Sequence, residues 1–148
     1  MTTNTTASTT MTTSTTATID LPVPADTVWQ LIGGFHALPD WLPYIPVSEL
    51  REGGRVRVLT NEEGGAIVER LERFDDDART YTYSIVDAPF PVTGYRSTLT
   101  VHDVDGTGSR VEWSGTFTPA GVGEEEAAAL FQGIYRDGLM ALRQTLGA

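Results

Sequence analysis

Glu69 is the residue whose type and position in this sequence best suit a chemical role. It lies in residues 66–74, a run that alternates in character with a period of two, as half-buried strands do. The alternation places Glu69 on the same face as Ile67 and Leu71, among apolar side chains. A carboxylate in such surroundings must be hydrogen-bonded, ion-paired or protonated, because an isolated buried charge is too costly.

Three roles for Glu69 are compatible with this position. It could be a general acid or base whose pKa is raised by burial, working beside the hydroxyl groups of Tyr83 and Tyr95. It could be a polar anchor for a bound ligand. It could also form a structural ion pair with Arg57 on a neighbouring strand, although Val56 and Val58 favour the opposite face for that arginine. The residues alone leave the three roles open.

The strands that carry these residues form one continuous stretch. Residues 66–74, 79–86, 95–104 and 110–118 are rich in β-branched and aromatic residues, and short turns separate them. Strands with such short connections are antiparallel neighbours. Their alternation predicts an inner face made of Ile67, Glu69, Leu71, Tyr81, Tyr83, Ile85, Tyr95, Ser97, Leu99, Val101, Val111, Trp113, Gly115 and Phe117. His102 then points outward, so it is a poor catalytic candidate.

The rest of the sequence predicts the elements that close over this face. They are a strand at 17–21, a helix at 24–32, a short helix or turn within 35–45, strands at 47–51 and 55–60, and a long helix at 123–146. The long helix begins with three glutamates and continues with an apolar stripe that includes Phe131, Tyr135 and Leu139. This order predicts an α+β, helix-grip fold, in which a curved antiparallel sheet of about seven strands wraps around the C-terminal helix.

The N-terminal segment differs in composition from the rest of the chain. Eleven of the first eighteen residues are threonine, and none of the eighteen side chains is charged. Such a segment offers too little apolar surface to fold, which predicts a disordered tail at residues 1–16 and one folded domain at 17–148. It has neither the basic start nor the apolar run of a secretory signal, and no later segment resembles a membrane span, so we expect a cytoplasmic protein.

Composition argues against several classes of function. The formal net charge of −10 disfavours binding to nucleic acid and insertion into anionic membranes. The absence of cysteine and the presence of only two histidines exclude thiol catalysis and a metal site rich in cysteine or histidine. No Ser-His-Asp set, phosphate-binding loop or dinucleotide fingerprint occurs, and we expect no cofactor. The oligomeric state is not determined by these features.

Several short segments resemble a known family. They are Val28-Trp29, Phe35, Trp41-Leu42-Pro43, Glu69-Arg70-Leu71, Tyr95-Arg96-Ser97 and Trp113-Ser114-Gly115-Thr116-Phe117. Over about residues 18–146 the chain resembles the START-like superfamily, and within it bacterial proteins of the polyketide cyclase/dehydrase type. The resemblance implies a helix-grip domain with an internal cavity. It implies no single function, because this superfamily includes cyclases, lipid carriers and hormone receptors.

The plant abscisic-acid receptors are similar around Glu69-Arg70-Leu71, Tyr95-Arg96-Ser97 and Val101-His102. This similarity implies a cavity lined by Glu69, Tyr83, Tyr95, Ser97 and Trp113 on the sheet and by Phe131, Tyr135 and Leu139 on the closing helix. Phe117 shares the inner face by alternation, and Phe35 and Trp41 lie in the segment that rims the cavity mouth in this fold. The family pattern also allows Arg57 to face inward.

Three departures argue against a hormone receptor. Leu42 stands where those receptors have a lysine that holds the ligand carboxylate. Residues 61–65 replace their proline-containing gate loop, and residues 90–92 replace their histidine-arginine-leucine latch. We therefore expect a carrier or binding protein for a neutral hydrophobic small molecule, aromatic or polycyclic in character. The alternative is a cyclase or dehydratase in which Glu69 and the cavity tyrosines transfer protons.

Overall fold

A computed structural model describes residues 12–148, which form one seven-stranded antiparallel sheet with three helices. The sheet order is β1-β7-β6-β5-β4-β3-β2. The strands are β1 (Thr13–Leu21), β2 (Val47–Arg51), β3 (Val56–Thr60), β4 (Ala66–Asp75), β5 (Thr80–Asp87), β6 (Val92–Val104) and β7 (Gly108–Pro119). The helices are α1 (Ala25–Ile32), α2 (Leu38–Trp41) and α3 (Glu124–Leu146), with a short 3-10 turn, η2 (Glu52–Gly54), between β2 and β3. The helix-grip prediction is confirmed.

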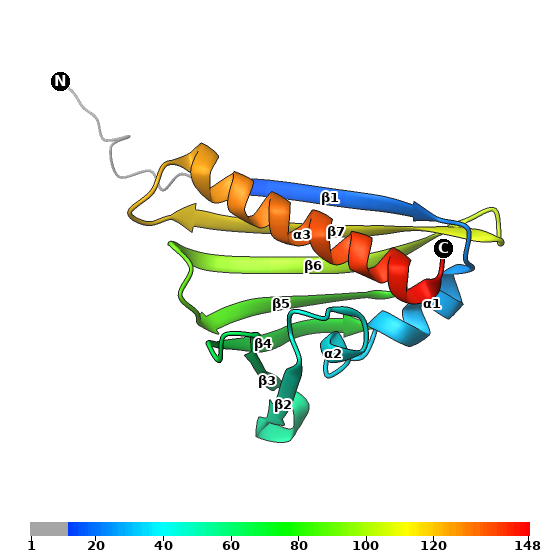
Figure 1. Ribbon diagram of the computed structural model, residues 1–148, viewed down its shortest axis with the longest axis horizontal. Coiled ribbons are helices and arrows are strands. Elements are labelled where there is room, and N and C mark those ends of the chain that lie inside the picture. The colour runs from blue at the N-terminus through cyan, green and yellow to red at the C-terminus, as the bar shows by residue number, and fades with distance from the viewer. Residues whose placement is uncertain (1–11) are drawn as a thin grey trace.

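The long helix α3 lies diagonally across the sheet and packs on β1 and β7 (Figure 1). Its first turn contains three glutamates, which the helix dipole favours, and Gly147 ends it in the left-handed conformation with φ 69°. Phe131, Tyr135, Leu139 and Leu142 are all buried at helical spacing, as the apolar stripe predicted. Helices α1 and α2 follow β1, and α2 contacts α3.

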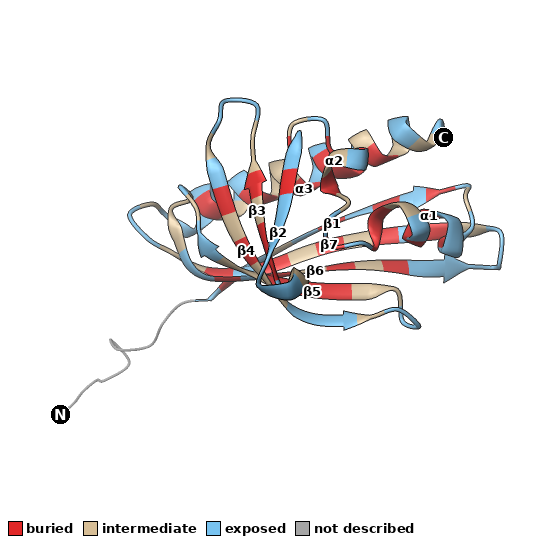
Figure 2. Ribbon diagram, turned by 90° about the horizontal axis from the view of Figure 1, so that it is seen from below, coloured by how far each residue is buried: buried red, intermediate tan, exposed pale blue. Residues whose placement is uncertain are grey.

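The strands alternate between buried and exposed residues, and the buried positions recur along the strands beneath the helices (Figure 2). In β6, Tyr95, Ser97, Leu99 and Val101 are buried, whereas Arg96 between them is exposed. This is the inner face predicted from the period-two pattern. The pairing of β4 with β5 shifts register twice, between Val68 and Glu69 and again between Leu71 and Arg73. Such irregularities bend a sheet locally, and here they accompany its curvature around α3.

Strand β1 begins at Thr13, four residues before the position expected from the sequence. The prediction of a disordered tail over residues 1–16 is therefore wrong for 13–16, while residues 1–11 lie outside the described part of the chain. Thr13 pairs with Phe117 of β7 and is buried, and the Thr15 hydroxyl donates to the side chain of Gln132 on α3. Threonine is β-branched and suits a strand, so low sequence complexity was a misleading signal here.

A pair of truncations tests this boundary. Deletion of residues 1–16 removes four residues of the β1–β7 ladder and the Thr15–Gln132 hydrogen bond, so it should lower the melting temperature by several degrees. Deletion of residues 1–11 keeps the whole of β1 and is the matched control. Equal melting temperatures for the two truncated proteins, measured by circular dichroism, would show that residues 13–16 contribute nothing to the sheet.

Candidate functional site

A cavity of about 350 Å³ lies between the inner face of the sheet and α3. Most of its wall is apolar or aromatic. The lining residues are Leu38, Leu42, Tyr44, Ile45, Arg57, Leu59, Asn61, Glu62, Glu63, Ile67, Glu69, Tyr83, Ile85, Phe90, Tyr95, Trp113, Phe131, Ile134 and Tyr135. A volume of this size is within the range of small-molecule sites.

Six of the eleven ligand-binding residues expected from the sequence line this cavity. They are Glu69, Tyr83, Tyr95, Trp113, Phe131 and Tyr135. The other five, Phe35, Trp41, Ser97, Phe117 and Leu139, are buried in the packed core beside it. Trp41 packs against Trp113 with ring centroids 5.8 Å apart, and Phe117 stacks on Tyr95 at 6.1 Å. These five side chains therefore support the wall rather than form it.

Arg57 and Glu69 form a buried ion pair within the cavity wall. They are neighbours across the β3–β4 ladder, and they are 1% and 6% exposed. Nε and Nη2 of Arg57 lie 2.8 and 2.7 Å from Oε1 of Glu69. The question that the sequence left open is thus resolved, because Arg57 faces inward. Val56 is buried as well, so the apolar neighbours of Arg57 did not indicate its orientation.

The guanidinium of Arg57 is enclosed by further partners. Its Nη1 donates to the carbonyl oxygen of Phe35 at 2.9 Å and lies 3.4 Å from the hydroxyl of Tyr81. The guanidinium carbon lies 4.2 Å from the ring centroid of Phe35 and 4.9 Å from that of Tyr83. Such cation–π contacts favour arginine over lysine, because the planar guanidinium stacks on aromatic rings. Phe35 therefore acts on the site by holding Arg57.

The two charges of the pair influence each other's protonation. Burial raises the pKa of the Glu69 carboxyl above its ordinary value, and the Arg57 guanidinium opposes that rise. Burial also disfavours the charge of Arg57, but the nearby Tyr81 hydroxyl and Glu69 carboxyl outweigh this effect and raise the pKa of Arg57. Arginine thus stays charged, and Glu69 supplies the charge that compensates it inside the wall.

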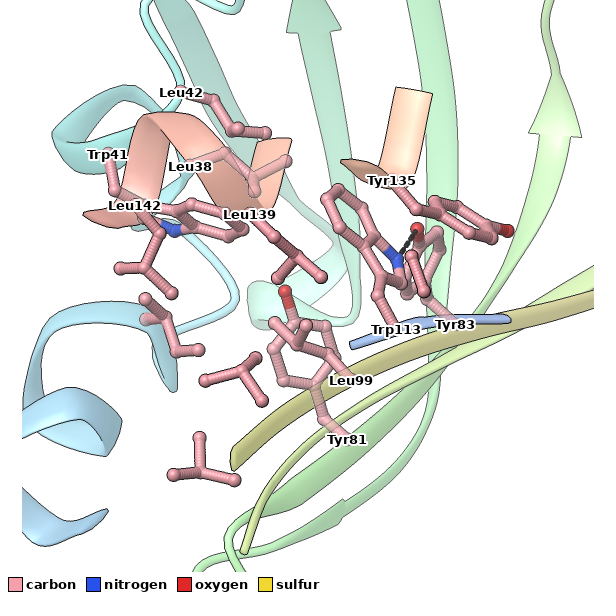
Figure 3. Close-up of a cluster of buried hydrophobic side chains, with 14 of the residues drawn as sticks. Leu38, Trp41, Leu42, Tyr81, Tyr83, Leu99, Trp113, Tyr135, Leu139 and Leu142 are labelled. Atoms are coloured by element: carbon pink, nitrogen blue, oxygen red, sulfur yellow. Dashed lines mark hydrogen bonds between the residues drawn. The ribbon is translucent and has the colours of Figure 1, made fainter. Parts of the chain in front are cut away.

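A second polar group lies at the cavity wall and combines side chains from β5, β6, β7 and α3. Trp113 Nε1 lies 3.1 Å from both the Tyr83 hydroxyl and the Ser97 hydroxyl, and Figure 3 shows the first of these bonds as a dashed line. The hydroxyls of Tyr95 and Tyr135 are hydrogen-bonded to each other. Ser97 donates to the carbonyl oxygen of Ser114 at 2.7 Å, which anchors the group to the sheet.

The tyrosines of this group are neutral at physiological pH. Burial raises the pKa of Tyr83, Tyr95 and Tyr135 above the ordinary value of 10.0. Burial also raises the pKa of Tyr44 to about 12, with a further contribution from the charge of Asp137. These hydroxyls can therefore donate and accept hydrogen bonds, but they are poor bases.

Two glycines allow α3 to approach the sheet this closely. A side-chain carbon at Gly115 would collide with the hydroxyl of Tyr135. A side-chain carbon at Gly138 would lie 2.6 Å from the Trp113 ring and 3.0 Å from the Tyr44 hydroxyl. The close packing of Trp113 and Tyr135, with ring centroids 4.9 Å apart, depends on both positions.

The mouth of the cavity is the region where its lining residues are exposed to solvent. Glu62 and Glu63, in the loop between β3 and β4, line the cavity and are exposed. The side chain of Asn61 holds this loop, because its Oδ1 accepts hydrogen bonds from the backbone N–H groups of Glu63 at 3.0 Å and Gly65 at 2.8 Å. Phe90, from the loop between β5 and β6, packs against Phe131 at the same cavity.

Several lining residues were not among the expected site residues, although signals for some were present. Ile67 and Ile85 belong to the inner face that alternation predicts, and Asn61 and Phe90 lie in the two segments, 61–65 and 90–92, where the sequence departs from the receptors. Leu38, Leu59 and Ile134 had no signal that separates a cavity wall from ordinary core. His102 is exposed, and its Nε2 lies 2.8 Å from Glu112 Oε1, which confirms its outward orientation.

The curved sheet, the long helix and the cavity between them define a START-like helix-grip domain. The chain belongs to the family described as polyketide cyclase/dehydrase and lipid transport, whose model matches residues 12–147. Within residues 12–148, no helix has both the length and the apolar character needed to cross a membrane, and no group of three acidic or histidine side chains is placed to hold a metal ion.

Comparisons with known proteins agree with this assignment. The chain is 28% identical to abscisic acid receptor PYL6 of Arabidopsis thaliana over 137 residues, which is 83% of this chain and 64% of the receptor. It is 59% identical to the protein XoxI from Bacillus cereus, with a TM-score of 0.87 over 89% of this chain and 94% of that structure. The Zhui aromatase/cyclase from Streptomyces sp. R1128 matches with a TM-score of 0.72 over 93% of each chain, at 18% identity, which shows a shared fold alone.

Proposed function

We propose that this protein binds a neutral hydrophobic small molecule, aromatic or polycyclic in character, in the cavity beneath α3, and that it acts as a carrier or binding protein. The observation that carries the proposal is the cavity itself, about 350 Å³ in volume, with a mostly apolar and aromatic wall. Burial of an aromatic ligand against such a wall supplies affinity through the hydrophobic effect. Membership of a family described by cyclase, dehydrase and lipid-transport members supports a hydrophobic ligand.

The charge state of the wall supports binding over catalysis. A general acid or base needs a proton that it can exchange with the substrate, whereas Glu69 is engaged by Arg57 through Oε1. A second free ionisable group opposite Glu69 would favour an enzyme. In the group around Trp113, the polar atoms are tyrosine and serine hydroxyls and the Trp113 N–H, and burial raises the pKa of each of its three tyrosines. The other carboxylates that line the cavity, those of Glu62 and Glu63, are exposed at its mouth.

A cavity-filling substitution on α3 tests the proposal. Ile134 lines the cavity, so Ile134→Trp should fill part of it and weaken binding of the neutral probe N-phenyl-1-naphthylamine by about tenfold or more. Leu130→Trp is the matched control, because Leu130 lies one turn earlier on the same helix, is 38% exposed and does not line the cavity. Probe fluorescence reports both affinities. Equal loss in both variants, or none in either, would place the probe elsewhere.

An enzyme of the cyclase or dehydratase type is the second candidate. It is favoured by the burial-raised pKa of Glu69, which would keep some carboxyl protonated above the ordinary 4.5 of a glutamate. If Glu69 moves a proton, Glu69→Gln should lower turnover of a polyketide-type substrate by about 10²–10⁴-fold. The same variant should also lose the limb of the pH–rate profile that reports the ionisation of Glu69. Unchanged turnover in folded Glu69→Gln protein would remove this candidate.

A further inference from the structure

The cavity wall offers an incoming ligand an acceptor at Glu69 but no free cation among its described residues. Arg57 is the one arginine or lysine that lines the cavity. Its guanidinium is occupied by Glu69, by the Phe35 carbonyl oxygen and by two aromatic rings. A ligand anion would therefore find no unpaired positive charge there.

In contrast, only one of the two carboxylate oxygens of Glu69 has a hydrogen-bond partner among the described residues. The described contacts with Arg57 both end on Oε1, at 2.8 and 2.7 Å, and no residue of 12–148 donates a hydrogen bond to Oε2. Oε2 is also not among the polar atoms that are fully enclosed without a partner. Oε2 therefore keeps some accessible surface, and Glu69, which is 6% exposed, lines the cavity. A buried carboxylate oxygen in this position favours a hydrogen-bond donor.

The mouth of the cavity adds negative charge. Glu62 and Glu63 line it, and neither takes part in an ion pair with a described residue. The Asn61 side chain fixes the loop that carries them. The lining thus contains three glutamates and one arginine. An anionic ligand would meet like charges at the mouth and again at Glu69, and like charges at short range disfavour binding.

We propose that the cavity selects its ligand by polarity: the ligand carries a hydrogen-bond donor, such as a phenolic hydroxyl or an aromatic N–H, that meets Oε2 of Glu69, and ligands bearing a carboxylate or sulfonate are rejected. This inference rests on the proposed function, because it concerns the same cavity. It narrows the ligand class from hydrophobic aromatic molecules to those with a donor and without an acid group.

Two matched pairs of probes test this selection on the full chain without any substitution at Glu69. The first pair is 2-naphthol and 2-methoxynaphthalene, in which a methyl group replaces the hydroxyl hydrogen. The naphthol should bind about 10- to 100-fold more tightly, as expected for a hydrogen bond to a charged oxygen. The second pair is N-phenyl-1-naphthylamine and 8-anilinonaphthalene-1-sulfonate, which differ by the sulfonate. The neutral amine should bind about tenfold more tightly or better.

A variant separates charge from shape in the second comparison. In the double variant Glu62→Gln, Glu63→Gln the preference for the neutral amine should shrink severalfold, and added salt should shrink it in the wild-type protein. Equal affinity within each probe pair would overturn the polarity inference while leaving the proposed function intact. A preference for the neutral amine that neither the double variant nor added salt changes would overturn the charge argument, since steric exclusion of the sulfonate would then explain it. If none of the four probes binds, the proposed function itself fails.

Discussion

Replacing Glu69 with glutamine is expected to lower the free energy of unfolding by about 3–5 kcal/mol, the usual cost of leaving a buried charge without its partner. The guanidinium of Arg57 remains charged in the variant, because arginine does not lose its proton at accessible pH. It also cannot turn to solvent, since it is 1% exposed and held between Phe35 and Tyr83. Urea denaturation followed by circular dichroism measures the loss.

The double variant Arg57→Met, Glu69→Gln is the control for this prediction. Removal of both charges replaces a costly buried ion pair with apolar and neutral groups of similar size, so part of the lost stability should return. A single Glu69→Gln variant as stable as the wild-type protein would contradict the buried pair. It would also mean that the register of β4 is shifted by one residue, with Glu69 facing solvent.

Gly138→Ala is expected to destabilise the protein by about 1–3 kcal/mol, although alanine is the better helix former. The added carbon would lie 2.6 Å from the Trp113 ring and 3.0 Å from the Tyr44 hydroxyl. Trp113 cannot yield easily, because its N–H is hydrogen-bonded to Tyr83 and Ser97. Helix α3 must therefore move away from the sheet. The free energy of unfolding and the affinity for N-phenyl-1-naphthylamine should both change.

Gly133→Ala is a control on the same helix, and it is expected to raise the free energy of unfolding rather than lower it. A side-chain carbon at Gly133 would meet no atom within 4 Å, so the gain in helix propensity is unopposed. This variant should be more stable by up to about 1 kcal/mol. If the two alanine variants change stability equally, the close approach of α3 at Gly138 does not limit the packing of this domain.

The inner face of the sheet was predictable because period-two alternation is a strong signal where one face is buried. The alternation predicts that Glu69, Tyr83, Tyr95 and Trp113 lie on that face, and all four are buried. The apolar stripe of α3 followed from helical spacing in the same way. These patterns identify which side chains point inward, and they do so from local sequence alone.

Local patterns could not separate the cavity wall from the packed core. Ser97 and Phe117 share the inner face with Tyr95 and all three are buried, yet only Tyr95 of the three lines the cavity. The orientation of Arg57 was equally hidden, because it depends on a partner across the ladder rather than on its own neighbours. Strand β1 was underestimated because its threonines derive their structure from pairing with β7.

The most direct test of the account is to locate a bound probe by nuclear Overhauser effects between N-phenyl-1-naphthylamine and the methyl groups of the protein. We expect contacts from the probe to the methyl groups of Leu59, Ile67, Ile85 and Ile134, which come from three strands and α3 and share one cavity. The exposed methyl groups of Leu50, Val104 and Met140 lie outside the cavity and should show none. Contacts confined to these exposed groups would contradict an internal ligand site.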